Sequence, residues 1–202
     1  MMRTWRKGLI LAGLAMVCSL AWPQTTPGPA GPALGKGHLW LKAGQFDLNG
    51  DAAGEWGVDR EGYLALEGYG ELDDEVYIGG ELGRSAAASG VNDDGDRIED
   101  FDFLWLEWNT KMAFDLERGF SVDVGLGGAL FYVSGDKVIA SGDFSSTAPL
   151  ADVGFGVQVF TDFNWRTRRL LIGLDAKYQW AFDVIDISYS NLRFGAHVGF
   201  CF

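Results

Sequence analysis

Ten charged residues recur at the polar positions of segments in which apolar and polar side chains alternate. Four are basic and six are acidic: Lys42, Lys111, Lys177 and Arg193, and Glu67, Glu81, Glu107, Asp123, Asp152 and Asp175. If these segments are strands, their polar positions share one face, and charges buried on that face need partners. We predict that they form ion pairs between neighbouring strands and fill a polar interior. A narrow ion path is the functional alternative to this structural core.

The two histidines offer little for catalysis. A nucleophile needs an adjacent base, and neither His38 nor His197 is followed two positions later by Ser or Cys. We therefore predict no catalytic residues and no enzymatic activity. His197 is interpreted as a packed interior side chain near Arg193.

Two acidic segments carry oxygen ligands at alternate positions, as calcium loops do. The candidates are Asp47, Asn49 and Asp51 in one segment, and Asn92, Asp94 and Asp96 in the other. Neither segment has the glycine at the sixth place and the glutamate at the twelfth place of a calcium loop. We expect solvated acidic loop tips, with no bound metal and no cofactor. Divalent ions bridging these loops to lipopolysaccharide are a weaker alternative.

Eight segments with a period of two residues would position these side chains. They span residues 38–48, 63–72, 76–84, 103–115, 120–132, 152–165, 170–182 and 191–202. No helical period exceeds about two turns, and past residue 21 no apolar run reaches the roughly 18 residues of a membrane helix. Any crossing of a membrane must therefore use strands.

The connections between these segments alternate in length. Residues 72–75, 116–119 and 166–169 form short turns, whereas 49–62, 85–102, 134–148 and 183–190 form longer loops. Short turns at one end and long loops at the other are typical of an outer-membrane barrel. The sequence predicts an all-β, eight-stranded antiparallel up-and-down transmembrane barrel with short periplasmic turns and longer extracellular loops.

Alternation alone also fits a soluble barrel with an apolar interior. Bulky aromatic side chains near the strand ends favour the membrane barrel, because they form two girdles. The girdle residues are Phe114, Phe120, Phe163, Trp165, Phe200 and Phe202 at the short turns, and Trp108, Tyr132, Tyr178, Trp180 and Phe182 at the long loops. An eight-stranded barrel with all these side chains inside would be overfilled.

The start of the chain indicates secretion. Residues 1–21 combine Arg3, Arg6 and Lys7 with an apolar run and small residues before a cleavage site after Ala21, as in a signal peptide. Residues 22–36 form a Pro- and Gly-rich linker, and residues 37–202 form the barrel. Cleavage would leave Cys201 as a lone cysteine, so no intramolecular disulfide is expected.

The charge balance excludes one class of partner. The chain has 16 Lys+Arg against 28 Asp+Glu, a net charge of −12. Without the signal peptide, 13 basic residues face 28 acidic ones, a net charge of −15. Binding to nucleic acid through the net field needs clustered positive charge, so we predict no nucleic-acid partner.

The last strand carries the resemblance to a known group of proteins. Val198, Phe200 and Phe202 alternate with Gly199 and Cys201, and the chain as given ends on Phe. Together with the eight amphipathic segments, this pattern resembles the small outer-membrane barrels of the OmpA, OmpX and OmpW type over about residues 37–202. The resemblance implies a monomer in the outer membrane of a Gram-negative-type cell, in contact with outer-membrane lipid and lipopolysaccharide. It also implies that the terminal alternation is an assembly signal for the barrel-assembly machinery.

Three functions are compatible with the sequence. We expect a largely plugged lumen and a structural or surface-interaction role through acidic extracellular loops. The first alternative is a narrow pore or transporter for small or hydrophobic solutes, which the OmpW-type resemblance allows. The second is a lipid A-modifying enzyme, although the His-x-Ser pair of the deacylase type is missing after His197.

Overall fold

The computed structural model describes residues 36–49, 57–58, 60–86, 88–91, 96–141, 144–182 and 188–202. The predicted signal peptide and all of the predicted linker except Lys36 lie outside the described residues. Within the described ranges, no helix is long and apolar enough to cross a membrane.

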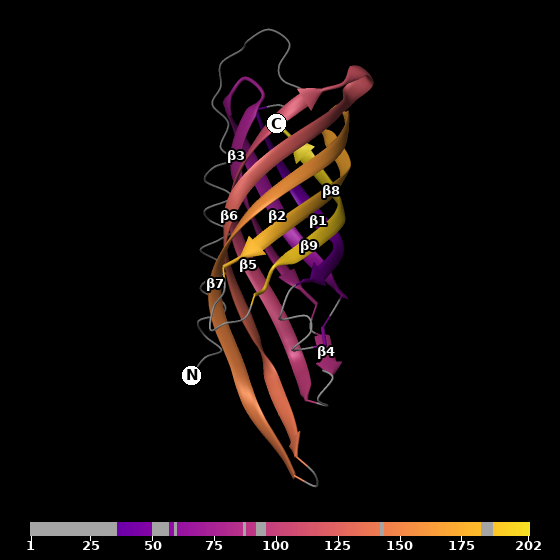
Figure 1. The fold of residues 1–202 in the computed structure, drawn as a ribbon. Helices are drawn as coiled ribbons and strands as arrows, with labels where there is room; N and C mark the ends of the chain where they lie inside the picture. Colours follow the sequence, from indigo (N-terminus) through magenta and orange to yellow (C-terminus); the bar gives the residue numbers. More distant parts are fainter. Residues whose placement is uncertain are drawn as a thin grey trace.

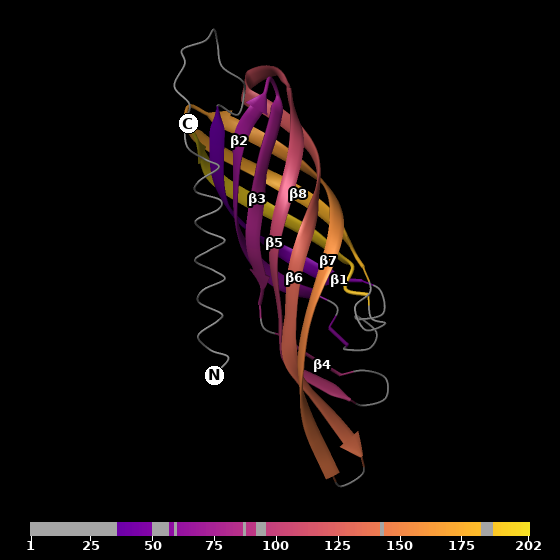
Figure 2. The ribbon, with the colours of Figure 1, turned by 90° about the vertical axis from the view of Figure 1, so that its left-hand side faces the viewer.

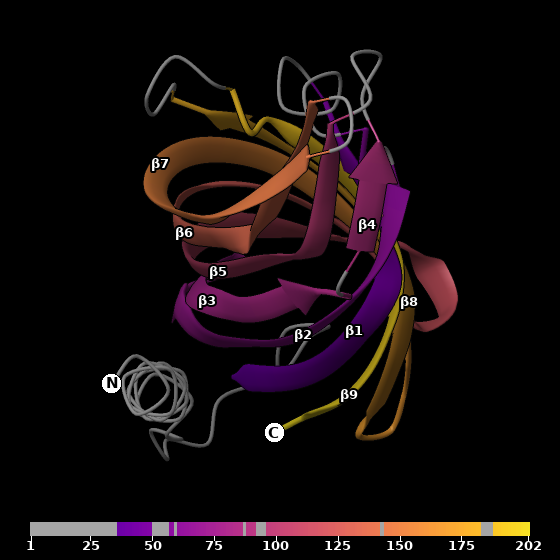
Figure 3. The ribbon, with the colours of Figure 1, turned by 90° about the horizontal axis from the view of Figure 1, so that it is seen from below.

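Eight antiparallel strands form a closed ring, each paired with its neighbours along the chain (Figures 1 and 3). They are β1 Gly37–Leu48, β2 Arg60–Asp73, β3 Val76–Ser85, β5 Arg97–Asp115, β6 Phe120–Ser141, β7 Phe144–Thr167, β8 Leu170–Ala181 and β9 Asn191–Cys201. A short strand, β4 (Ala88–Val91), pairs with the part of β5 that lies beyond the end of β3. The predicted all-β, up-and-down barrel of eight strands is confirmed.

The ring closes where the first and last strands meet. The N–H of Gly37 donates to the carbonyl of Phe202 at 3.0 Å, and the N–H of Phe202 donates to the carbonyl of Gly37 at 2.9 Å. Gly44 allows close approach of the two backbones, since a Cβ atom there would lie 2.0 Å from the Phe194 carbonyl oxygen. Closure satisfies the backbone groups of both terminal strands, as a barrel in lipid requires.

The three short turns lie at the end of the barrel that holds the C-terminus (Figure 1). They join β2 to β3, β5 to β6 through the 3-10 turn η1 (Glu117–Gly119), and β7 to β8. Glu75, Arg118 and Arg168 adopt φ angles of 64°, 63° and 55° in these turns. This left-handed conformation is uncommon for residues other than glycine.

The long-loop end corrects two loop predictions. Most of the predicted loop 134–148 is strand, because β6 and β7 stay paired out to Ser141 and Phe144. The β-branched residues Val138, Ile139 and Thr147 favour this extended hairpin, which projects beyond the rest of the barrel (Figure 2). The predicted loop 85–102 likewise contains β4 and the first residues of β5.

The strands separate two kinds of side chain. Apolar side chains such as Leu126, Phe155 and Leu174, each more than 60% exposed, cover the outer face. The inner face carries buried polar and charged side chains together with aromatic ones. Apolar side chains therefore form a continuous outer surface, while the interior combines polar, charged and aromatic side chains.

Candidate functional site

The ten charged residues predicted for the lumen are all buried, and the most exposed of them, Asp152, is 8% exposed. Nine of the ten take part in ion pairs with one another. Asp152 lies apart near the long-loop end, where its carboxylate accepts the N–H of Val153 at 2.8 Å. Asp162, which was not among the predicted site residues, pairs with Lys111.

The central charges are sorted by wall. Glu67, Glu81 and Glu107 lie directly beside one another on β2, β3 and β5. Lys177 and Arg193 lie side by side on β8 and β9, across the barrel from β3 and β5. An acidic wall therefore faces a basic wall. The prediction of pairs between neighbouring strands is wrong for Glu81, Glu107, Lys177 and Arg193, because their neighbours carry like charges or none. It holds for Glu67, which pairs with Lys42 on the adjacent β1 at 3.0 Å.

The ion pairs of this central network cross the lumen. The Glu81 carboxylate lies 2.8 Å from the Lys177 Nζ, 3.2 Å from the Arg193 Nη1 and 3.3 Å from the Lys42 Nζ. Glu107 accepts hydrogen bonds from both Lys177 and Arg193. Each cation is shared between carboxylates, and this sharing offsets the cost of removing the charges from water.

Asp175 on β8 joins the central network to a polar chain. It lies 3.6 Å from the Lys42 Nζ and accepts the Tyr63 hydroxyl at 3.1 Å. The imidazole of His197 lies between the Asp175 carboxylate, 3.5 Å from Nδ1, and the Asn164 side-chain oxygen, 2.7 Å from Nε2. Its ring also stacks on Trp40 at a centroid distance of 4.2 Å. His197 is thus a packed interior residue, as predicted.

A second network surrounds Lys111, nearer the short turns. The Lys111 Nζ lies 2.7 Å from Asp123 and 3.3 Å from Asp162. It also lies 3.9 Å from the ring centroid of Trp40 and 4.3 Å from that of Tyr69, within the range of cation–π contacts. The even-numbered position of Asp162 on the inward face of β7 was the signal that could have identified it.

Two groups of buried apolar residues lie on either side of the central charges. Toward the short turns the group contains Trp40, Tyr69, Tyr77, Ala113, Phe160, Leu171 and Cys201. Toward the long loops it includes Phe46, Phe101, Phe103, Trp105, Phe131, Val133 and Tyr189. We call these the inner and outer aromatic layers.

The outer aromatic layer is tied both to the charges and to the loops. The indole N–H of Trp105 donates to Glu81 at 2.7 Å, and the Arg193 guanidinium lies 4.6 Å from the Trp105 ring centroid. Val58 and Tyr189, which lie outside the strands, are 2% and 1% exposed within the same layer. The sequence does not reveal this layer, because single strands do not show which residues meet across the lumen.

The weak metal candidates have other partners where they are described. Asp47 pairs with Arg60 at 3.1 Å, and Asp96 lies 3.8 Å from Lys137. Within the described ranges, no three His, Cys, Asp or Glu side chains gather as a metal site would require. Asn49 follows β1, whereas the other three candidates, Asp51, Asn92 and Asp94, lie outside the described residues.

The three residues of the predicted assembly signal share the outer face of β9 and the residue after it. Val198, Phe200 and Phe202 are exposed, and none contacts the lumen networks. Their role in assembly stays a prediction.

No protein-family model and no curated protein matches the sequence. Solved structures do match in fold. Neisserial surface protein A is similar at 12% identity, with a TM-score of 0.62, over 83% of this chain and 97% of that one. A major outer-membrane protein of Thermus thermophilus is similar at 13% identity, with a TM-score of 0.54, over 81% and 99%.

The outer-membrane protein OprG of Pseudomonas aeruginosa is similar at 12% identity, with a TM-score of 0.53, over 85% of this chain and 99% of that one. These likenesses span nearly the whole of each known chain. The chain described here therefore shares its fold with small outer-membrane barrels, as the sequence pattern indicated.

Proposed function

We propose that this protein is an outer-membrane barrel with a closed lumen, and that it acts through the surface formed by its long-loop end. The observation that carries the proposal is the set of ion pairs that join the acidic wall to Lys177 and Arg193 across the lumen. Conduction of ions through the lumen would require these ion pairs to break.

The closed lumen is supported by what lies above and below the central network. An eight-stranded barrel has an interior just wide enough for side chains. Here aromatic layers occupy that interior on both sides of the charges. Ions would meet buried apolar rings before and after the charged section, and burying an unpaired ion among them is costly.

The outer face supports residence in a membrane. Apolar side chains cover it, with Phe114, Phe163 and Trp165 near the short turns and Trp180 and Phe182 near the long loops. Aromatic girdles and short turns at one end are properties of outer-membrane barrels. With the predicted signal peptide, they favour an outer-membrane location and delivery to the barrel-assembly machinery.

The described part of the long-loop end continues the barrel outward. The β6–β7 hairpin projects beyond the barrel, and the side chains of Val58 and Tyr189 are buried in the outer aromatic layer. Its charges are mostly acidic, and each of its four described basic side chains already has a carboxylate partner. The surface therefore suits a partner with positive charge, or lipopolysaccharide bridged through divalent cations.

Cysteine labelling on intact cells tests this arrangement. In a Cys201→Ser background, Thr147→Cys on the projecting hairpin should react with a membrane-impermeant maleimide. The matched variant Asp74→Cys, in the β2–β3 turn, should react only after the outer membrane is permeabilised. Both residues are exposed. Labelling of Asp74→Cys alone on intact cells would reverse the orientation, and labelling of neither would contradict the surface location.

The charged lining favours one alternative, a narrow pore or transporter for small solutes. Uptake of a labelled solute into liposomes that contain the protein would support it, and tight liposomes would argue against it. A lipid A-modifying activity has less support, because both ring nitrogens of His197 already contact side chains of the barrel interior, Asp175 and Asn164. Unchanged lipid A masses after expression would argue against that activity.

A further inference from the structure

The rim at the short-turn end carries acidic residues in one turn and basic residues in another. The β2–β3 turn carries Asp73, Asp74 and Glu75, and it lies beside β5, where the Ala113 N–H donates to the Glu75 carbonyl at 2.8 Å. The β7–β8 turn, between β6 and β9 in the ring, carries basic residues instead. Its sequence from residue 166 to residue 169 is Arg-Thr-Arg-Arg.

Three basic side chains of the rim lack the carboxylate partners that basic side chains have at the other end of the barrel. At the long-loop end, Arg60, Arg84, Arg97 and Lys137 each lie within 4.0 Å of a carboxylate. Arg118, Arg168 and Arg169 are exposed, and none of the three has an ion-pair partner among the described side chains. Their charges are therefore free to meet an anion from outside the chain.

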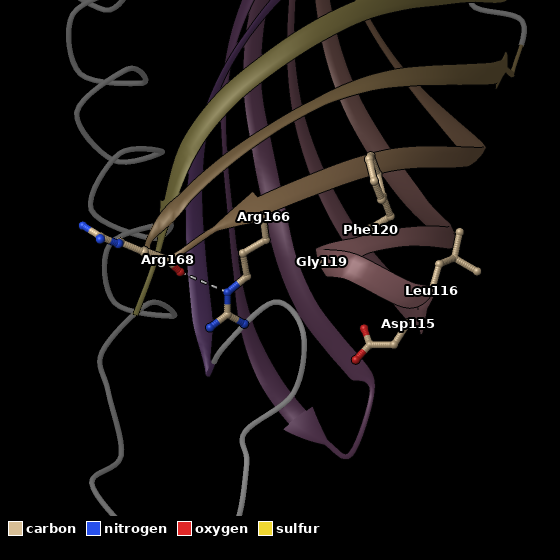
Figure 4. Close-up of a pocket in the computed structure, with 6 residues that line it drawn as sticks. All are labelled: Asp115, Leu116, Gly119, Phe120, Arg166 and Arg168. Atoms are coloured by element: carbon tan, nitrogen blue, oxygen red, sulfur yellow. Dashed lines mark hydrogen bonds between the residues drawn. The ribbon is translucent and has the colours of Figure 1, made fainter.

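The β5–β6 and β7–β8 turns lie next to one another. A Cβ atom on Gly119 would come 2.7 Å from the Arg166 carbonyl oxygen, and Phe120 pairs with Trp165. A pocket of about 300 Å³ opens between the turns, lined by Asp115, Leu116, Gly119, Phe120, Arg166 and Arg168 (Figure 4). The Arg168 side chain points away from this pocket, outward from the barrel wall.

Apolar rings adjoin this basic rim on the outer face. Phe120 stacks on Phe163 at 5.6 Å and lies 6.4 Å from Trp165 between ring centroids. Phe200 is 65% exposed, and its residue pairs with Leu170 at the start of β8. A ligand at this place would therefore meet cations at its head and aromatic surface along its length.

We propose that this rim binds an anionic phospholipid of the adjoining leaflet. Arg168 and Arg169 hold the phosphodiester, and the acyl chains lie along the aromatic side chains above the turns. Guanidinium groups match phosphate oxygens with paired donors. A lipid with an anionic headgroup fits these two guanidinium groups better than a zwitterionic one, whose own cation would lie beside them.

This inference rests on the membrane location in the proposed function, but not on a closed lumen. Its test is native mass spectrometry of the folded, detergent-solubilised protein with phosphatidylglycerol or phosphatidylcholine of the same acyl chains. We expect tighter retention of phosphatidylglycerol. A basic residue near an anionic lipid surface contributes roughly fivefold in affinity, so R168Q/R169Q should weaken phosphatidylglycerol binding by roughly 25-fold and leave phosphatidylcholine binding unchanged.

The matched control is R60Q/R97Q, which removes two exposed arginines at the long-loop end and should leave the lipid preference intact. The single variant R169Q avoids the strained Arg168 position and should lose roughly fivefold in affinity. Equal binding of the two lipids by the native chain would overturn the proposal, as would an equal loss in the control. Heat-modifiable gel migration reports the folded barrel separately, so failure to form a barrel is distinguishable from failure to bind lipid.

Discussion

The lumen contains two charge networks that are built in different ways. The central network joins opposite walls, because Glu81 and Glu107 on β3 and β5 bind Lys177 and Arg193 on β8 and β9. The network of Lys111 stays on one wall, since its carboxylates come from β6 and β7, the next two strands beyond its own.

This difference indicates two roles. Ion pairs across the lumen hold opposite walls together and close the lumen, and each cation there pairs with more than one carboxylate. The Lys111 pairs anchor a local cluster, and the rings of Trp40 and Tyr69 cover the ammonium group from the remaining side. Replacing single residues in each network should therefore have unequal effects.

The largest effect is expected for Lys177→Met. The change leaves Glu67, Glu81 and Glu107 with fewer cations in a buried place. Removing one partner of a buried pair costs about 3–5 kcal/mol, and we expect the upper end of this range because three carboxylates are affected. Urea unfolding in lipid vesicles, followed by heat-modifiable gel migration, measures the free energy of unfolding. A loss below about 1 kcal/mol, the value for a surface ion pair, would show that the cross-lumen ion pairs do not stabilise the barrel.

Lys111→Met should cost less, about 3 kcal/mol, because it leaves only Asp123 and Asp162 without their cation. The same unfolding measurement applies. A loss larger than that of Lys177→Met would reverse the ranking of the two networks.

Arg60→Gln supplies the surface reference. Arg60 pairs with Asp47 at 3.1 Å, but its side chain is 68% exposed. Exposed ion pairs contribute about 0.2–1 kcal/mol, so the free energy of unfolding should change by no more than that. A larger loss would show that the long-loop end depends on its surface pairs as well as on the outer aromatic layer.

The double variant Lys177→Met/Lys111→Met tests whether the networks are separate. They share no ion pair. Tyr69 contacts both, since its hydroxyl donates to Glu67 at 3.0 Å and its ring lies 4.3 Å from the Lys111 Nζ. The coupling energy in a double-mutant cycle should therefore stay near about 0.5 kcal/mol, the lower end for residues that share a partner. A coupling energy well above this value would mean that the lumen charges form one network.

Much of the fold follows from the sequence. A period of two residues assigns each side chain to a face, and turn residues such as those at 72–75 and 116–119 mark the strand ends. The inward positions of Lys42, Lys177 and Arg193 follow from the same rule. The extended hairpin was missed because Gly135 and a run of small polar residues resemble a loop, whereas pairing with the other strand keeps them extended.

Which charged residues pair with one another could not be predicted in the same way. Period two gives the face of Glu81 but not the register that places it between Glu67 and Glu107. The predicted strand order places β8 and β9 across the ring from β3 and β5, but it does not show which of their side chains meet there. The outer aromatic layer was missed for this reason, since its members come from distant strands.

Single-channel recording of the purified native protein in a planar lipid bilayer tests the closed lumen most directly. The cross-lumen ion pairs and the two aromatic layers predict a folded, inserted barrel without steady conductance. Steady steps at the nanosiemens level from pure protein would contradict the closed lumen and favour the narrow pore.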